Sequence, residues 1–325
     1  MKLLLWLLPL VHSLKHRPEG EVYPLQLALG KASAPSRDLP QRFQKLDLER
    51  LYGRPLEYLR CDPKVPPQAD GERCAPFKGE LHFTPRPLKL VLGVMAMTSQ
   101  EEIQDAHRAT WMKKPGVCPV QQYQDVRCRV FPVFVFGSTN RTLANDSVRL
   151  ESVPEPPAKW DGFKDSKGTE GWKRSWWTSQ FKTPAWLAYA AANFPWATHV
   201  GKMDSDTFPD IISVMEDLAR KPVSVLGHEW PVLYGRHFMG GYNGKGGVFG
   251  EFYALSSSLL ECFLKEDAKK VARSGLIHGH KTTWGSEWWK YAEDQVLRTT
   301  LFYAEENRVC PAILDANVDR WQHPV

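Results

Sequence analysis

The sequence predicts an α/β domain over residues 86–325, built on a mainly parallel sheet covered by helices on both faces. Three observations predict it. An apolar run at 88–97 is typical of a buried strand, a helical segment follows to about Trp111, and an apolar, β-branched run covers 126–136. Strand, helix and strand in this order are typical of a βαβ unit whose two strands are parallel.

The segments that follow continue the alternation of helices and strands. The first helix begins where Ser99-Gln100-Glu101-Glu102 has the spacing of a capping box. Pro184 is expected in the first turns of a later helix, which ends at Pro195. The remaining expected elements are a polar loop at 137–174, a helix at 179–193, a strand at 198–203, a helix from Pro209 with Ile211, Ile212, Met215 and Leu218 on one face, strands at 223–226 and 252–255, a glycine-rich loop at 240–250, and helices at 257–264 and 294–304.

Two segments precede this domain. Residues 1–13 carry one basic residue and a short apolar run, the pattern of a secretory signal or a short membrane anchor. The run is shorter than the roughly 20 apolar residues that a membrane-spanning helix needs. Residues 14–85 are rich in Pro, Arg, Lys and Gln, which predicts a stem or a loosely packed N-terminal extension.

The cysteines and two acceptor sequons point to the secretory pathway. Six cysteines are present, and Cys61–Cys74 and Cys118–Cys128 are the simplest disulfide pairs. Sequons for N-glycosylation begin at Asn140 and Asn145, beside the predicted polar loop. An even cysteine count behind a signal-like segment favours an oxidising compartment, so we expect secretory localisation and membrane association through residues 1–13.

The composition argues against a nucleic-acid partner and leaves two roles open for the tryptophans. The net charge is +5, and Lys and Arg are scattered without a dense basic stripe, so we expect no nucleic-acid partner. The clustered tryptophans either pack in the core or form a platform for sugar rings, whose apolar C–H faces stack on indole. These tryptophans are Trp172, Trp176, Trp177, Trp186, Trp196, Trp284, Trp288 and Trp289.

The strongest local signal is Asp204-Ser205-Asp206, which lies between a predicted strand and a predicted helix. Carboxylates spaced in this way can converge on one Mg²⁺ or Mn²⁺, which prefer oxygen ligands. Open α/β sheets bind ligands at the carboxyl ends of their strands. The position therefore predicts a metal site at Asp204 and Asp206.

Five short blocks follow one another along residues 88–300. They are Ala106-His107-Arg108-Ala109-Thr110-Trp111, Phe181-Lys182-Thr183-Pro184-Ala185-Trp186-Leu187, Val200-Gly201-Lys202-Met203-Asp204-Ser205-Asp206-Thr207-Phe208, Gly246-Gly247-Val248-Phe249-Gly250-Glu251-Phe252-Tyr253-Ala254-Leu255-Ser256 and Ala292-Glu293-Asp294-Gln295-Val296. In this order they resemble the Arg-x-Thr-Trp, Leu-Lys-Thr, Lys-x-Asp-Asp-Asp-x-Phe, Gly-Gly-x-Gly-Tyr-x-Leu-Ser and Glu-Asp-Val elements of the β-1,3-glycosyltransferase family, glycosyltransferase family 31. This family includes β-1,3-galactosyl- and β-1,3-N-acetylglucosaminyltransferases.

The chain departs from the family pattern at three places. Ser205 replaces the middle acid of the Asp-Asp-Asp element, an insertion lies around Val248 to Glu251, and Gln295 interrupts the last block. The two outer carboxylates remain, so we expect metal binding to remain. The insertion changes the part of the chain that would shape the acceptor loop.

The resemblance implies an inverting, metal-dependent transferase with a GT-A-type fold, located in the Golgi lumen or membrane. The implied cofactor is Mn²⁺ or Mg²⁺, the donor is UDP-galactose or UDP-N-acetylglucosamine, and the acceptor is a glycan. Arg108 would contact the nucleotide or brace its helix through a carboxylate, and Lys202 would contact the diphosphate or form a structural salt bridge. The residues expected at the nucleotide sugar are Thr98, Ser99, Arg108, Lys202, Asp204, Ser205, Gly246 and Gly247.

An inverting transfer needs one base to take the proton of the acceptor hydroxyl. Asp294 is the first candidate and Glu293 the second, with helix capping as the structural alternative for Asp294. His323 is the expected third protein ligand of the metal, ahead of His278 and His280.

Two other functions stay open. Asp204-Ser205-Asp206-Thr207 loosely fits the nucleophile motif of haloacid-dehalogenase-like phosphatases, but we find no downstream Gly-Asp-x-x-x-Asp block. Ser205 and the altered glycine block also suit a catalytically inactive, glycan-binding homologue. Release of UDP from a UDP-sugar in the presence of Mn²⁺ distinguishes the transferase from both.

Overall fold

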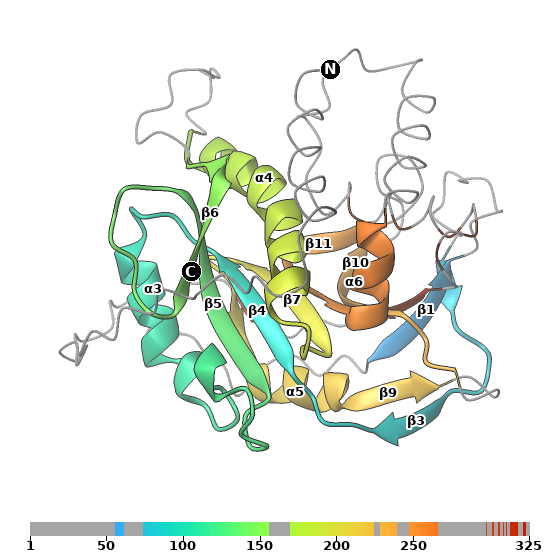
Figure 1. Cartoon of the computed structure of the whole chain (residues 1–325). Helices are drawn as coiled ribbons and strands as arrows, with labels where there is room; N and C mark the ends of the chain where they lie inside the picture. Colours follow the sequence, from blue (N-terminus) through green and yellow to red (C-terminus); the bar gives the residue numbers. More distant parts are fainter. Residues whose placement is uncertain are drawn as a thin grey trace, which may run out of the picture.

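The computed structural model describes residues 56–61, 74–155, 170–223, 228–238, 247–265, 313–317 and 321–322, and residues 297, 301, 305, 308 and 310 singly. Within them, a nine-stranded sheet has the order β2-β1-β12-β10-β11-β7-β4-β5-β6. Helices pack on this sheet (Figure 1), which confirms the α/β class.

The parallel half of the sheet contains β4 (Leu90–Met95), β5 (Val130–Ser138), β6 (Ser147–Pro154) and β7 (His199–Asp204). All four run in the same direction, with β4 between β5 and β7. Every residue of β4 is buried, because helices cover both of its faces. The predicted parallel sheet is confirmed for this half.

The other half of the sheet is mixed rather than parallel. Here β11 (Gly247–Ser256) is antiparallel to both β7 and β10 (Val232–Phe238), whereas β10 is parallel to β12 (Leu314–Asn317). Two further antiparallel strands complete the edge, β1 (Glu57–Cys61) and β2 (Cys74–Pro76). The sheet therefore recruits strands from before residue 86, out of the segment expected as a stem or extension.

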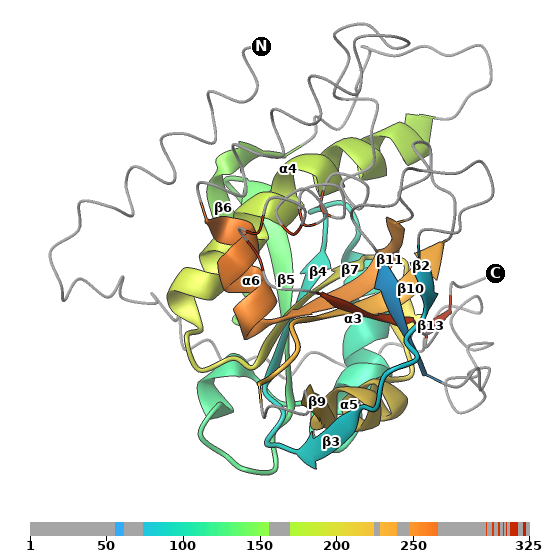
Figure 2. The same cartoon turned by 90° about the vertical axis from the view of Figure 1, so that its right-hand side faces the viewer.

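Two helical layers enclose the sheet (Figure 2). One face carries α3 (Glu101–Ala109) and α5 (Ile211–Ala219), and the other carries α4 (Glu170–Asn193) and α6 (Ser257–Leu264). Trp186 of α4 is fully buried and lies directly over Gly93 of β4, where any side chain would clash with its indole ring. Its indole N–H also donates to the carbonyl of Gly201 on β7, at 2.9 Å. Trp186 is thus a core residue rather than a sugar platform.

Several expected elements are corrected. The helix around Pro184 begins at Glu170, so Pro184 lies inside α4 and not in its first turns. The N-cap of α3 is Gln100, and no side chain caps it, so the capping box at Ser99 does not form. The Gln100 side chain instead accepts from the N–H of Met97 at 3.0 Å.

The helix expected from Pro209 begins at Ile211, because Asp210 caps it by accepting from the N–H of Ser213. Ile212 is 38% exposed and does not belong to its buried face. The polar loop expected at 137–174 contains the strand β6 and the first turn of α4. Part of the glycine-rich loop expected at 240–250 is strand, since β11 begins at Gly247.

Four short strands form two further pairs. Here β3 (His82–Pro85) pairs with β9 (Arg220–Val223), so the strand expected at 223–226 begins earlier. The strand β8 (Phe208–Pro209) pairs with β13 (Trp321–Gln322). Of the helix expected at 294–304, Leu297 and Leu301 are helical and buried, and the other residues lie outside the described ones.

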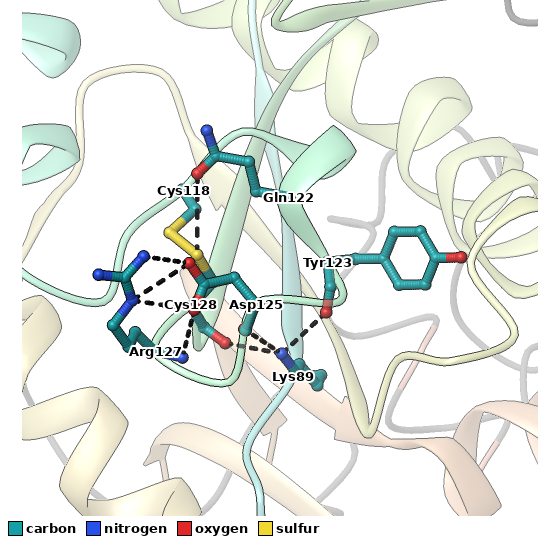
Figure 3. A network of polar contacts seen from close by, with 7 residues as sticks. All are labelled: Lys89, Cys118, Gln122, Tyr123, Asp125, Arg127 and Cys128. Carbon is teal, nitrogen blue, oxygen red and sulfur yellow. Dashed lines mark hydrogen bonds and ion pairs between the residues drawn. A yellow bond between two sulfur atoms is a disulfide. The ribbon is translucent and has the colours of Figure 1, made fainter.

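A disulfide loop holds the start of β4 (Figure 3). Cys118 and Cys128 are bonded, as predicted, and the ammonium of Lys89 donates to the carbonyls of Tyr123, Asp125 and Cys128 at 2.8, 2.8 and 3.0 Å. The loop is thereby fixed to the amino end of the parallel strands.

A second disulfide, Cys262–Cys310, was not predicted. The Cα atoms of Cys61 and Cys74 lie opposite each other in the β1–β2 pair, the placement that their predicted bond requires.

Asn140 and Asn145 are exposed in the loop between β5 and β6. Residues 1–13 lie outside the described part of the chain. Within the described part, no helix is long and apolar enough to cross a membrane.

Candidate functional site

The predicted metal ligands lie at the point where the strand order reverses. From β4 the chain proceeds to β5 and β6 on one side, and then returns to place β7 on the other side of β4. The carboxyl ends of β4 and β7 are therefore neighbours, and Met95 is the Cα partner of Asp204. A crevice outside such a reversal is where open α/β sheets bind their ligands.

A tight turn from Asp204 to Thr207, here called the carboxylate turn, follows β7. The N–H of Thr207 donates to the carbonyl of Asp204 at 3.2 Å. The Asp204 side chain is 24% exposed, Ser205 is buried and Asp206 is exposed. The turn therefore presents two carboxylates and buries Ser205, the residue that replaces the family's middle acid.

A buried lysine lies directly beside the first carboxylate. Lys202 has no exposed side-chain surface, and its ammonium lies 2.6 Å from Oδ1 of Asp204. The same ammonium donates to the carbonyl of Gly250 on β11. Two roles were considered for Lys202, and these contacts correspond to the structural salt bridge. Contact with the diphosphate stays a prediction.

Glu251 adds a third carboxylate that the sequence did not single out. It precedes Phe252, the Cα partner of Met203, and so lies beside Asp204 across the β7–β11 pair. Burial raises the pKa of Asp204 above its ordinary value, Lys202 lowers it, and the negative charges of Asp206 and Glu251 raise it again. A divalent cation would relieve this repulsion, so the charges present fit a metal ion.

The described residues do not complete a metal site by themselves. Among them, no three side chains of His, Cys, Asp or Glu form a group that could hold a metal ion. The predicted third ligand, His323, lies outside the described residues, but Gln322 immediately before it pairs with Phe208, two residues after Asp206. The chain therefore brings the residue next to His323 to the end of the carboxylate turn.

The end of β4 lies beside the start of the carboxylate turn, because β4 and β7 are neighbouring strands. Thr98 and Ser99 form a turn after this strand, and Ser99 is exposed. The carbonyl of Thr98 accepts from Arg141 at 2.9 Å, and Arg141 also pairs with Glu101. The two residues predicted to contact the nucleotide therefore lie in the turn after β4, the strand that pairs with β7.

Arg108 points into a different network. Its Nε and Nη2 atoms form a bidentate pair with Asp146, at 2.8 and 3.0 Å, and Nη1 donates to Asp105 at 3.0 Å. These contacts describe the bracing role, in which Arg108 ties α3 to the β5–β6 loop. A contact with the nucleotide stays a prediction.

A buried ion pair joins three elements at the carboxyl end of the parallel strands. The ammonium of Lys182, on α4, has no exposed surface and contacts the carbonyl of Ala96 at 2.6 Å and Glu155 at 2.7 Å. Glu155 accepts from the N–H of Gly137 at 2.6 Å. Burial lowers the pKa of Lys182, and Glu155 partly restores it. In the sequence, Lys182 was noted only as one residue of the block Phe181 to Leu187, without a role of its own.

A fully buried histidine contacts the carboxylate turn from α3. Nε2 of His107 lies 2.7 Å from the carbonyl oxygen of Ser205, and Nδ1 accepts from the indole N–H of Trp111 at 2.7 Å. Its burial lowers the pKa to about 4, to which Arg108 contributes, while the bond to Ser205 opposes the shift. The first and third sequence blocks thus meet in space, which their spacing along the chain could not show.

Of the remaining predicted site residues, only Gly247 lies among the described ones. Gly247 is the first residue of β11, whereas Gly246, Glu293 and Asp294 lie outside the described residues, as do His278 and His280. A comparison with protein-family models found no match, and a comparison with curated proteins found no significant match.

Proposed function

We propose that the chain is a metal-dependent inverting glycosyltransferase with a GT-A-type fold, which moves galactose or N-acetylglucosamine from a UDP-sugar to a glycan hydroxyl. The observation that carries the proposal is the position of Asp204 and Asp206, at the strand reversal and beside a third carboxylate. A parallel half joined to a mixed half also supports the GT-A-type fold.

The proposed metal is Mn²⁺ or Mg²⁺, held by Asp204, Asp206 and His323. It would neutralise charge that develops on the leaving diphosphate. Lys202 opposes the effect of burial on the pKa of Asp204, because the ammonium favours the charged carboxylate. Thr98 and Ser99, at the end of β4, would contact the uridine or its ribose.

Asp294 is the proposed base for the acceptor hydroxyl, with Glu293 as the second candidate. Gly246 and Gly247 would allow the backbone to approach the donor closely. The secretory signals of the sequence, together with the disulfide Cys118–Cys128, support the proposal of a Golgi enzyme.

An inactive glycan-binding homologue is the second candidate, and the Lys202–Asp204 ion pair favours it. A carboxylate already paired with a buried ammonium has less charge to offer a metal ion. The two candidates differ in one measurement, the release of UDP.

The decisive experiment is a UDP-release assay with several UDP-sugars, an acceptor panel, and Mn²⁺ either present or chelated. The transferase releases UDP only with metal and a suitable donor, and Asp206→Asn abolishes that release. A purified, folded protein that binds glycans yet never releases UDP would establish the inactive homologue. Asp210→Asn is the matched control, because Asn also caps helices well.

A further inference from the structure

Both ring nitrogens of His107 are engaged, and their partners fix its tautomer. An indole N–H can only donate, so Nδ1 of His107 must accept from Trp111. The proton of the neutral ring therefore lies on Nε2, which donates to the carbonyl of Ser205 at 2.7 Å. Protonation on Nδ1 would place one donor against another, and a ring turned over would place carbon atoms where both nitrogens now bond.

The same ring also packs against the residue that follows the carboxylate turn. His107 stacks on Phe208, with 4.3 Å between ring centroids and 15° between ring planes. The rings of His107 and Trp111 meet edge to face, with 5.9 Å between their centroids. His107 thus contacts the residue before Asp206 through a hydrogen bond and Phe208 beyond it through stacking.

We infer that His107 is a positioning residue that fixes the directions of Asp204 and Asp206, with Trp111 holding the imidazole in the required orientation. The inference rests on the proposed function for its metal. The carbonyl of Ser205 lies in the middle of a tight turn, between the two residues that carry the carboxylates. A hydrogen bond that holds this carbonyl therefore restricts the backbone of both neighbours. Trp111 lies four residues after His107, in the short 3-10 helix Trp111–Lys113 that follows α3.

Three variants test this inference. His107→Phe keeps the aromatic packing on Phe208 but removes both hydrogen bonds. His107→Gln keeps a donor and an acceptor, and so serves as the conservative rescue. His199→Phe is the matched control, because His199 is also a buried histidine but lies at the opposite end of β7, where it contacts Arg86.

The first measurement is Mn²⁺ affinity in the presence of UDP, by electron paramagnetic resonance, without any sugar transfer. Loss of an outer hydrogen bond to a metal site weakens metal binding by about 10-fold or more, which we expect for His107→Phe. His107→Gln should stay within about threefold of the wild type, and His199→Phe should lose thermal stability but not Mn²⁺ affinity. A folded His107→Phe protein with wild-type Mn²⁺ affinity would overturn the inference.

The second measurement needs no metal. Hydrogen exchange of a peptide that covers residues 203–209 should be faster in His107→Phe than in the wild type, His107→Gln or His199→Phe. If the wild type binds no Mn²⁺ with UDP, the proposed function fails, while the exchange data still decide whether His107 orders the turn. Should His107→Phe not fold, Trp111→Phe removes the donor to Nδ1 and must accelerate the same exchange; unchanged exchange would overturn the inference.

Discussion

Lys202 Nζ lies 2.6 Å from Oδ1 of Asp204, and the lysine side chain has no contact with solvent. Its ammonium also binds the carbonyl of Gly250, so one buried charge joins β7, β11 and the first carboxylate. Buried charges persist when they are paired and hydrogen-bonded. Any metal that binds Asp204 therefore shares this carboxylate with Lys202, whereas Asp206 is exposed.

Asp206→Asn should abolish both metal dependence and transfer. Removal of a metal ligand forfeits several kcal/mol of charge stabilisation, so activity should fall by at least about 100-fold. UDP release measured over a series of Mn²⁺ concentrations checks this. If the variant retains the wild-type dependence on Mn²⁺, Asp206 is not a ligand.

Asp294→Asn should retain UDP-sugar binding but lose transfer. A general base contributes about 10²–10⁴-fold to the rate, and an amide cannot accept the proton of the acceptor hydroxyl. Calorimetric titration with the UDP-sugar and an acceptor-dependent rate assay separate the two effects. Glu293→Gln tests the second candidate in the same assays, and full activity of Asp294→Asn would remove Asp294 as the base.

The free energy of unfolding should decrease as pH falls, in part because of His107. The unfolded chain protonates this residue near its ordinary pKa of 6.5, whereas the folded protein does so near a pKa of about 4. Between these values the unfolded state binds more protons, so acid favours unfolding, by on the order of 3 kcal/mol from His107.

Urea denaturation between about pH 7 and about pH 4 measures this slope. His107→Gln should show a smaller slope than the wild type, because Gln does not titrate. His199 has a pKa lowered well below its ordinary value, so its contribution persists in the variant. Equal slopes in both proteins would contradict the assignment of this effect to His107.

Glu155→Gln should destabilise the protein more than the double variant Lys182→Met/Glu155→Gln. The single change leaves the ammonium of Lys182 buried without its counter-charge, which costs about 3–5 kcal/mol, while Gln can still accept from Gly137. The double change removes both charges. Denaturant unfolding of the two variants gives the comparison, and a less stable double variant would contradict it.

Strands were predictable from the sequence where burial alone determines the residue pattern. Leu90–Met95 is buried on both faces and therefore appears as an uninterrupted apolar run. The strand Ser147–Pro154 was missed because Arg149 and Glu151 interrupt its apolar residues and form an ion pair with each other. Pro184 was misplaced because a proline within a long helix has no sequence pattern different from one near its start.

The candidate site divides in the same way. Asp204 and Asp206 were predicted because a strand, a turn and a helix are local features. His107 contacts Ser205, which is 98 positions away in the sequence, and Lys182 contacts Ala96, which is 86 positions away. No local pattern reveals such contacts. Glu251 becomes a neighbour of Asp204 only through the register between β7 and β11, which depends on the whole sheet.

The position of β12 has a consequence for biosynthesis. Leu314–Asn317 lies between β1 and β10, so the strands at the start of the described chain join the sheet only through a strand near its end. A ribosome delivers the N-terminal strands first. Until residues 314–317 emerge, β10 has an open edge, and such an edge can pair with other chains. Chaperone protection of the β10 edge should therefore matter most before residues 314–317 emerge.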